Sequence, residues 1–279
     1  MLASHQLPVV FLAQVQGPAR GRASRVLSQE CKTIAQLLDQ PALPYYQPVH
    51  KGPLSTEYYL NLLGDAHYHR RITHLHLVGS AQSDSLMLAS EAGDYPLTLD
   101  DLAYLVDALP RLSCVFLSGC ATRPLVELLL RKDVPAIVAT QARDDFRTCN
   151  QVAHAFYQYL AHGESLRDTF GLVRRQFKQL RSYRIYYDVE ADQMKGVPFD
   201  PSSDAVPWGL YYLKENAPCL ARAPRRRPVL KSTTPRRHKR LGYLRRLSFA
   251  SLALILGLLT VTLVLSLQAS RSWPLLTSF

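Results

Sequence analysis

Short apolar runs alternate with amphipathic segments along residues 8–215 of the chain. Apolar runs bounded by turn-forming residues are typical of buried strands, which we expect at residues 8–15, 45–49, 73–79, 113–119, 135–140 and 208–213. Apolar positions with helical spacing predict helices at residues 28–39, 56–69, 98–109, 123–133, 147–162 and 165–181. Strands and helices that alternate in this way predict an α/β fold with a mostly parallel central sheet covered on both faces.

Local signals sharpen several of these boundaries. Ser28 is a plausible N-cap for the first helix, and Thr98 with Asp101 forms a capping-box pattern that opens a later one. A proline places residues 45–49 at a sheet edge, and residues 86–89 with the turn-rich segment after them indicate a small hairpin. Residues 182–221 show weak periodicity, apart from the expected strand at 208–213.

The net charge of +11 is concentrated in one short segment. Residues 222–246 contain eleven Lys or Arg and no acid, and Arg271 is the only basic residue beyond them. Subtraction leaves 21 basic and 22 acidic side chains in residues 1–221. Because this larger part is nearly neutral, we do not expect it to bind nucleic acid.

The chain has five cysteines, Cys31, Cys114, Cys120, Cys149 and Cys219. An odd number without CxxC spacing argues against a disulfide framework and against a zinc site, and it favours a reducing compartment. We therefore expect no metal and no cofactor. The N-terminal run VVFLAQV, without a basic start, reads as a buried strand and not as a signal peptide.

Residues 247–267 form an uncharged run of 21 positions. As a helix with a rise of ~1.5 Å per residue this run spans ~31 Å, the thickness of the hydrocarbon core of a bilayer. A buried core helix is the alternative. The basic segment on its N-terminal side predicts that the preceding residues stay in the cytoplasm and that residues 268–279 cross. We expect a head at 1–221, a basic, Pro-containing linker at 222–246 able to contact anionic lipids, and a transmembrane helix at 247–267 in the cell membrane.

Two predicted strands end in a glycine followed by a small polar side chain. The strand at 73–79 ends at Gly79 and Ser80, and the strand at 113–119 ends at Gly119 and Cys120. In mostly parallel sheets, ligands and catalytic groups gather beyond the carboxyl ends of the strands. These two strand ends are therefore the candidate site.

Several segments together resemble the CHAT domain, a caspase- and separase-like cysteine peptidase fold. They are HLHLVGSA (74–81), CVFLSGCATRPLVELLLRKDVPAIVAT (114–140), AFYQYLAHGESLRDTF (155–170) and the closing WGLYYL (208–213). The resemblance covers about residues 8–215 and implies a three-layer, caspase-like sandwich. It also implies a catalytic dyad in which a histidine at one strand tip assists a cysteine at the next, with backbone N–H groups that stabilise the oxyanion.

The chain departs from that family pattern at the histidine. Cys120 occupies the nucleophile position, but the family's Gly-His-Gly or Gly-His-Ala matches Gly79-Ser80-Ala81, so Ser80 stands at the histidine position. A hydroxyl has no basic pKa near neutrality. His76 on the same strand lies ~13 Å back from the tip, whereas a base must come within about 3 Å of the sulfur, so we expect His76 to be a packed interior residue.

Asp144 and Asp145 follow the predicted strand at 135–140. The family has an acidic residue after this strand, and the resemblance implies that a carboxylate here would receive a basic substrate side chain. An acid pair favoured by the dipole of the following helix is the alternative reading.

These observations leave three hypotheses for function. The first is a catalytically impaired, membrane-anchored CHAT-like module that acts by binding a peptide, a protein or a copy of itself, in the bacterial signalling or defence systems that contain relatives of this family. The second is a working, membrane-localised cysteine endopeptidase that uses Cys120 with a non-standard base. The third is a membrane protein whose α/β head binds a small ligand.

Overall fold

The computed structural model divides the chain into two compact units, Met1–Pro228 and Val229–Phe279. It describes residues 7–14, 22–40, 45–53, 65–79, 81–82, 85–88, 95–141, 146–188, 193–199 and 203–221, all in the first unit. The predicted linker, transmembrane helix and C-terminal tail lie outside the described residues. So do Ser80, Asp144 and Asp145.

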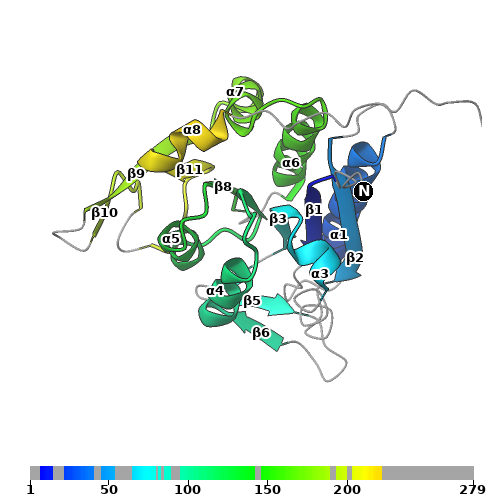
Figure 1. The fold of residues 1–279 in the computed structure, drawn as a ribbon, viewed down its shortest axis with the longest axis horizontal. Coiled ribbons are helices and arrows are strands. Elements are labelled where there is room, and N and C mark those ends of the chain that lie inside the picture. Colours follow the sequence, from blue (N-terminus) through cyan, green and yellow to red (C-terminus); the bar gives the residue numbers. More distant parts are fainter. Residues whose placement is uncertain are drawn as a thin grey trace, which may run out of the picture. The chain divides into compact units, whose positions relative to one another are not determined.

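A central eight-stranded sheet forms the middle of the first unit (Figure 1). Its strands, in spatial order, are β10 (Gln193–Lys195), β9 (Arg181–Asp188), β11 (Gly209–Leu213), β8 (Ala136–Ala139), β7 (Cys114–Ser118), β3 (Ile72–Val78), β1 (Val9–Gln14) and β2 (Gln47–Pro53). The five strands from β8 to β2 are parallel to one another. The predicted mostly parallel sheet is confirmed, and β2 is the edge strand that its proline indicated.

Helices cover both faces of this sheet, which makes three layers. In Figure 1, α4 (Leu99–Asp107) and α5 (Arg123–Arg131) lie on one side of the central strands, and α6 (Phe146–Ala161) and α7 (Leu166–Gln176) lie on the other. α1 (Arg22–Leu38) joins the layer of α6. Because successive strand residues point to opposite faces, β1 places Phe11 in the core beneath α4 and α5 and Leu12 in the core beneath α1 and α6.

A small antiparallel sheet follows β3 and precedes α4. It consists of β4 (Ala81–Gln82), β5 (Ser85–Leu88) and β6 (Tyr95–Thr98), which confirms the predicted hairpin and extends it by one strand. Thr98 ends β6 and caps α4: its Oγ1 accepts from the N–H of Asp101, and the Asp101 carboxylate accepts from the N–H of Thr98. The predicted capping box is therefore confirmed.

Several sequence-based predictions of elements and their boundaries were wrong. α1 begins at Arg22, so Ser28 lies inside the helix and does not cap it. The helix expected to reach residue 181 ends at Gln176, where Phe177 turns to an extended backbone (φ −117°, ψ 93°). Residues expected to be irregular form β9 and β10, followed after β11 by the short helix α8 (Ala217–Leu220).

The predicted helix at 56–69 is described only in its last turn, α3 (Ala66–His69). Within the part of the chain that the structure describes, no helix has the length and apolar character needed to span a bilayer.

Candidate active site

The two predicted strand tips lie side by side. β3 and β7 pair in parallel with Val78 opposite Ser118, so both strands end at the same level. Just beyond this pair, the N–H of Gly79 donates to the carbonyl of Ser118 at 3.1 Å. The sheet therefore brings together the two glycines that the sequence analysis singled out.

Residues after β8 fix the backbone of the second tip. Gly119 has a φ of +75°, a left-handed conformation that glycine adopts without steric strain. Its N–H donates to Oγ1 of Thr140 at 3.1 Å, and that hydroxyl donates to the carbonyl of Leu117 at 3.2 Å. Cys120 then forms an isolated antiparallel bridge with Gln141. These bonds hold the turn that presents Cys120.

The Cys120 side chain is buried, with 1% of its surface exposed. Its Sγ donates a hydrogen bond to the carbonyl of Leu77 at 3.3 Å. Burial raises the pKa of the Cys120 thiol, and the negative charge of Glu30 raises that pKa further, while the backbone N–H groups of Cys120 and Ser118 oppose the shift. The thiol is therefore protonated and shielded, which is the opposite of an activated nucleophile.

His76 belongs to a different cluster, beneath α1 and α6. Its Nε2 lies 3.1 Å from Oε1 of Glu30, and both side chains are almost fully buried. The imidazole packs against Phe116 and Tyr157, with ring centroids 5.0 and 5.3 Å away. The prediction that His76 is a packed, hydrogen-bonded interior residue is confirmed.

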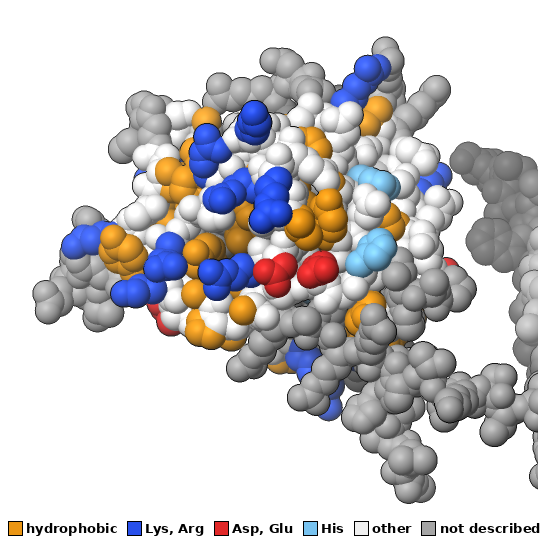
Figure 2. Space-filling model, turned by 90° about the horizontal axis from the view of Figure 1, so that it is seen from above, with side chains coloured by type: hydrophobic (Ala, Val, Ile, Leu, Met, Phe, Trp, Pro, Cys, Tyr) orange, Lys and Arg blue, Asp and Glu red, His pale blue; other side chains and the backbone are white. Residues whose placement is uncertain are grey.

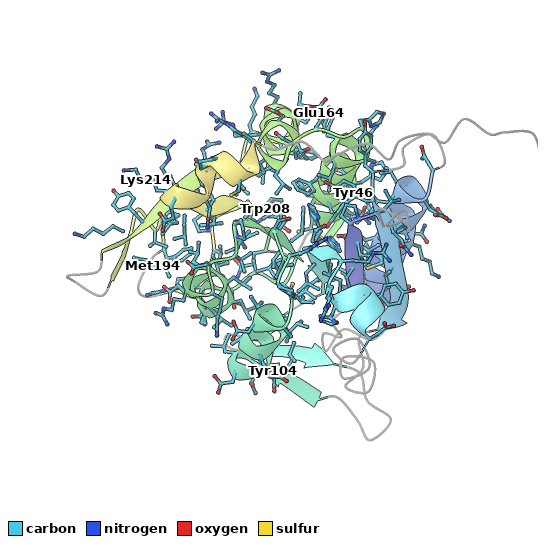
Figure 3. All side chains as sticks on the ribbon, viewed as in Figure 1. Tyr46, Tyr104, Glu164, Met194, Trp208 and Lys214 are labelled. Atoms are coloured by element: carbon cyan, nitrogen blue, oxygen red, sulfur yellow. The ribbon has the colours of Figure 1, made fainter. Side chains whose placement is uncertain are left out.

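His74 lies on the same face of β3, two residues earlier. Its Nδ1 is 2.9 Å from Oγ1 of Thr73, and Tyr46, labelled in Figure 3, meets its ring edge-on with centroids 5.1 Å apart. Burial lowers the pKa of His74 to about 3, so the ring is neutral at physiological pH.

The structure brings together Gly79, Gly119 and Cys120 among the predicted site residues. Ser80, Asp144 and Asp145 lie outside the described residues, so their predicted places at the histidine position and the substrate position stay predictions. Among the described residues, no imidazole forms a hydrogen bond with Cys120. A set of three or more His, Cys, Asp or Glu side chains arranged as metal ligands is also not found among them.

Glu30 was not predicted from the sequence. It is the one acidic residue among the buried side chains that the structure describes. A signal for it existed, because Leu27, Cys31, Ile34 and Leu38 form the buried stripe of α1, and Glu30 falls at helical spacing within that stripe. A carboxylate in an apolar stripe indicates a buried polar partner.

The fold and the site together define an α/β protein with a cysteine at a strand tip of a parallel sheet. The sequence model of the CHAT domain matches residues 8–213, most of the chain, so the protein belongs to the CHAT domain family. The resemblance seen in the strand-tip motifs is thereby confirmed. None of the curated proteins compared with the chain matches it.

Two solved structures of peptidases are similar to this chain. One is a secreted C11 cysteine protease from Bacteroides thetaiotaomicron in complex with an irreversible peptide inhibitor, with 11% identity, a TM-score of 0.38 and coverage of 64% of this chain. The match spans 61% of the protease chain. The other is the Drosophila initiator caspase Dronc, with 10% identity, a TM-score of 0.35, and coverage of 60% of this chain and 71% of the caspase.

Proposed function

We propose that this protein is a membrane-anchored CHAT domain whose peptidase site is catalytically impaired, and that it acts by binding. The observation that carries the proposal is the state of Cys120. Its thiol is buried, donates to the carbonyl of Leu77, and has a raised pKa. A cysteine nucleophile instead needs an accessible thiolate and an adjacent base.

Two backbone amides at the strand ends, those of Gly79 and Gly119, support the same proposal. An oxyanion site needs backbone N–H groups that are free to point at the substrate carbonyl. The N–H of Gly79 donates to Ser118, and the N–H of Gly119 donates to Thr140. Both donors are already used inside the protein.

The nearest histidine of β3 also argues against an efficient peptidase. His76 is held by Glu30 and by aromatic rings beneath α1 and α6, whereas Cys120 packs with the core beneath α4 and α5. To serve as a base, His76 would have to leave its buried carboxylate partner. Loss of a general base commonly lowers the rate by ~10²–10⁴-fold.

The anchor and the partner are part of this proposal. Residues 247–267 would span the cell membrane with the CHAT domain on the cytoplasmic face, and the basic residues of 222–246 would contact anionic lipids. The bound partner would be a peptide, another protein or a second copy of the chain. The alternative is an active membrane-localised endopeptidase in which substrate binding exposes Cys120 and supplies a rearranged base.

Alkylation of the native protein distinguishes an impaired site from an active endopeptidase. Cys219 is exposed and the other four cysteines are buried, so Cys219 serves as an internal reference. With iodoacetamide between pH 6 and 9, we expect Cys120 to react at least about a hundredfold more slowly than Cys219, because a buried thiol with a raised pKa supplies almost no thiolate in this range. Selective labelling of Cys120 with a midpoint well below pH 8 would contradict the proposal.

Introducing a histidine at position 80 tests whether the candidate peptidase site is otherwise intact. If Ser80 occupies the histidine position, Ser80→His should create or raise peptidase activity against a peptide library, and the Ser80→His, Cys120→Ala double variant should show none. Activity in the wild-type chain that is abolished by Cys120→Ala would establish the endopeptidase instead.

A further inference from the structure

A second site lies far along the chain from the strand tips, beside β9 and β11 and not beside β3 and β7. α7, β9, β11 and α8 enclose a pocket of about 250 Å³. Three arginines line it, and we call it the arginine pocket, defined by Arg167, Arg174, Arg184, Gly171 and Ser182. It shares none of its lining residues with the site of Cys120.

The spacing of these residues explains why they converge. On α7, Arg167, Gly171 and Arg174 are four and three residues apart, which places them on one face of the helix. On β9, Ser182 and Arg184 are two residues apart and point to the same face of the sheet. The helix and the strand thus present their polar groups to a shared space.

The floor of the pocket is apolar. β11 pairs with β9 in parallel, with Leu210 opposite Ser182 and Tyr212 opposite Arg184. Phe170 from α7 and Leu220 from α8 complete the apolar lining, and both are buried. The pocket therefore offers a ligand both cationic groups and an apolar surface.

The surrounding charge is strongly positive. Residues 166–184 contain six basic residues, Arg167, Arg174, Arg175, Lys178, Arg181 and Arg184, against one acid, Asp168. The Asp168 carboxylate accepts from the hydroxyl of Ser165 at the helix cap. Among the described residues, no carboxylate forms an ion pair with the three pocket arginines. Figure 2 shows Lys and Arg side chains gathered on this side of the molecule.

Gly171 keeps the pocket open. A Cβ built at this position meets no atom within 4 Å, so the missing side chain leaves space rather than relieving a clash. Glycine is among the poorest residues in a helix interior. Neither a steric clash nor a left-handed backbone requires glycine here, and the absent side chain leaves room beside the pocket arginines.

We propose that the arginine pocket binds a phosphate monoester that carries an apolar or aromatic group. Guanidinium groups bind phosphate oxygens in bidentate pairs, and three of them match a dianion better than a carboxylate. Ser182 adds a hydroxyl donor, and Tyr212 with the apolar floor receives the rest of the ligand. Water-soluble phosphate monoesters and the headgroup of phosphatidic acid share this chemistry.

Calorimetric titration of the full chain in neutral-detergent micelles with phenyl phosphate tests the proposal. We expect saturable binding at one site, weaker binding of inorganic phosphate, and none of phenol. Arg174→Gln should weaken binding at least about tenfold, as expected for the loss of one charge-assisted contact. The matched control is Arg175→Gln, because it removes the same charge from α7 beside the pocket and should leave the affinity within about twofold.

Gly171→Leu provides an independent test. It fills the pocket with an apolar side chain, should abolish binding of phenyl phosphate, and should leave the thermal midpoint unchanged or raised, because leucine favours the helix. Equal weakening by Arg174→Gln and Arg175→Gln, or binding that survives Gly171→Leu, would overturn the proposal, as would no saturable binding at all. Competition by phosphatidic acid in the micelles would assign the site to a lipid headgroup, and lack of competition to a soluble ester.

Discussion

At the scale of single residues, the polar groups buried beneath α1 and α6 distinguish this domain from a plain α/β core. His74, His76 and Glu30 lie among apolar and aromatic side chains of the core beneath α1 and α6. A buried polar group is costly unless it is paired. Each of these groups therefore makes the stability of the fold depend on its partner or on pH.

His74 predicts a pH dependence of stability. Its pKa in the folded protein is about 3, whereas an unfolded histidine titrates at about 6.5. Between these values only the unfolded state binds the proton, so the free energy of unfolding should fall as the pH drops from 6.5 towards 3, by up to ~1.4 kcal/mol per pH unit. Urea unfolding of residues 1–228 at pH 7 to 4 measures this slope. His74→Gln should flatten this pH dependence. The control, His162→Gln at an exposed position, should leave it unchanged. Equal slopes in the two variants would show that His74 is not the group responsible.

The Glu30–His76 pair predicts a large stability effect. Glu30→Ala leaves the buried imidazole of His76 without its partner and should lower the free energy of unfolding by about 3–5 kcal/mol. Replacing both partners, by Glu30→Leu with His76→Phe, should cost less than the sum of the single replacements. The half-exposed Arg123–Glu127 pair is the control, because Glu127→Ala should cost about 1 kcal/mol or less. Additive costs at Glu30 and His76 would refute the coupling.

Residue-level chemistry was only partly predictable from the sequence. The strand-tip pattern around Gly79, Gly119 and Cys120 placed these residues correctly, because parallel strands end at one edge of a sheet. The bond from the Cys120 thiol to Leu77 was not predictable, because it depends on the left-handed turn at Gly119 and on Thr140, which follows β8. Such contacts are set by tertiary structure and leave no local pattern.

At the scale of elements, the hydroxyl of Thr98 caps the start of α4, so its removal should destabilise the protein. Thr98→Ala removes the acceptor for the N–H of Asp101 and breaks the capping box. The free energy of unfolding should fall by about 1 kcal/mol. Thr98→Ser keeps the hydroxyl and is the matched control. A loss in Thr98→Ser as large as in Thr98→Ala, measured by urea unfolding, would show that packing of the methyl group and not the cap is responsible.

Elements whose apolar residues follow one clear periodicity were predicted well, and elements with conflicting sequence patterns were not. α5 combines a proline near its start with apolar positions at helical spacing, and its prediction was correct within two residues at its C-terminal end. β9 was missed, although Tyr183 and Ile185 alternate with polar residues as a half-buried strand requires. Its basic residues continue the basic pattern of α7, which extended the predicted helix past Gln176.

At the scale of the whole molecule, the charge distribution separates two regions with different expected partners. Residues 1–221 are nearly neutral in sum, and the structure adds that basic residues gather locally around the arginine pocket. The eleven basic residues of 222–246 follow α8, which forms one wall of that pocket. We expect the arginine pocket to bind a phosphate monoester and the basic segment of 222–246 to contact anionic lipids.

The anchor itself makes the last prediction. Residues 1–228 form a compact unit and should fractionate with soluble proteins. The full chain should remain in membranes after washing with 1 M salt, which reduces the electrostatic screening length to about 3 Å. Only detergent should release it. Leu256→Arg with Leu259→Arg places two charges in the middle of the apolar run and should release the chain, because each charge costs about 3 kcal/mol at the centre of a bilayer. The control replaces Arg236 and Arg237 with Gln, which weakens lipid contacts of the linker but leaves the apolar run intact, and this variant should stay in the membrane. Release of the wild-type chain by salt alone would mean that the basic segment, and not a spanning helix, holds the protein at the membrane.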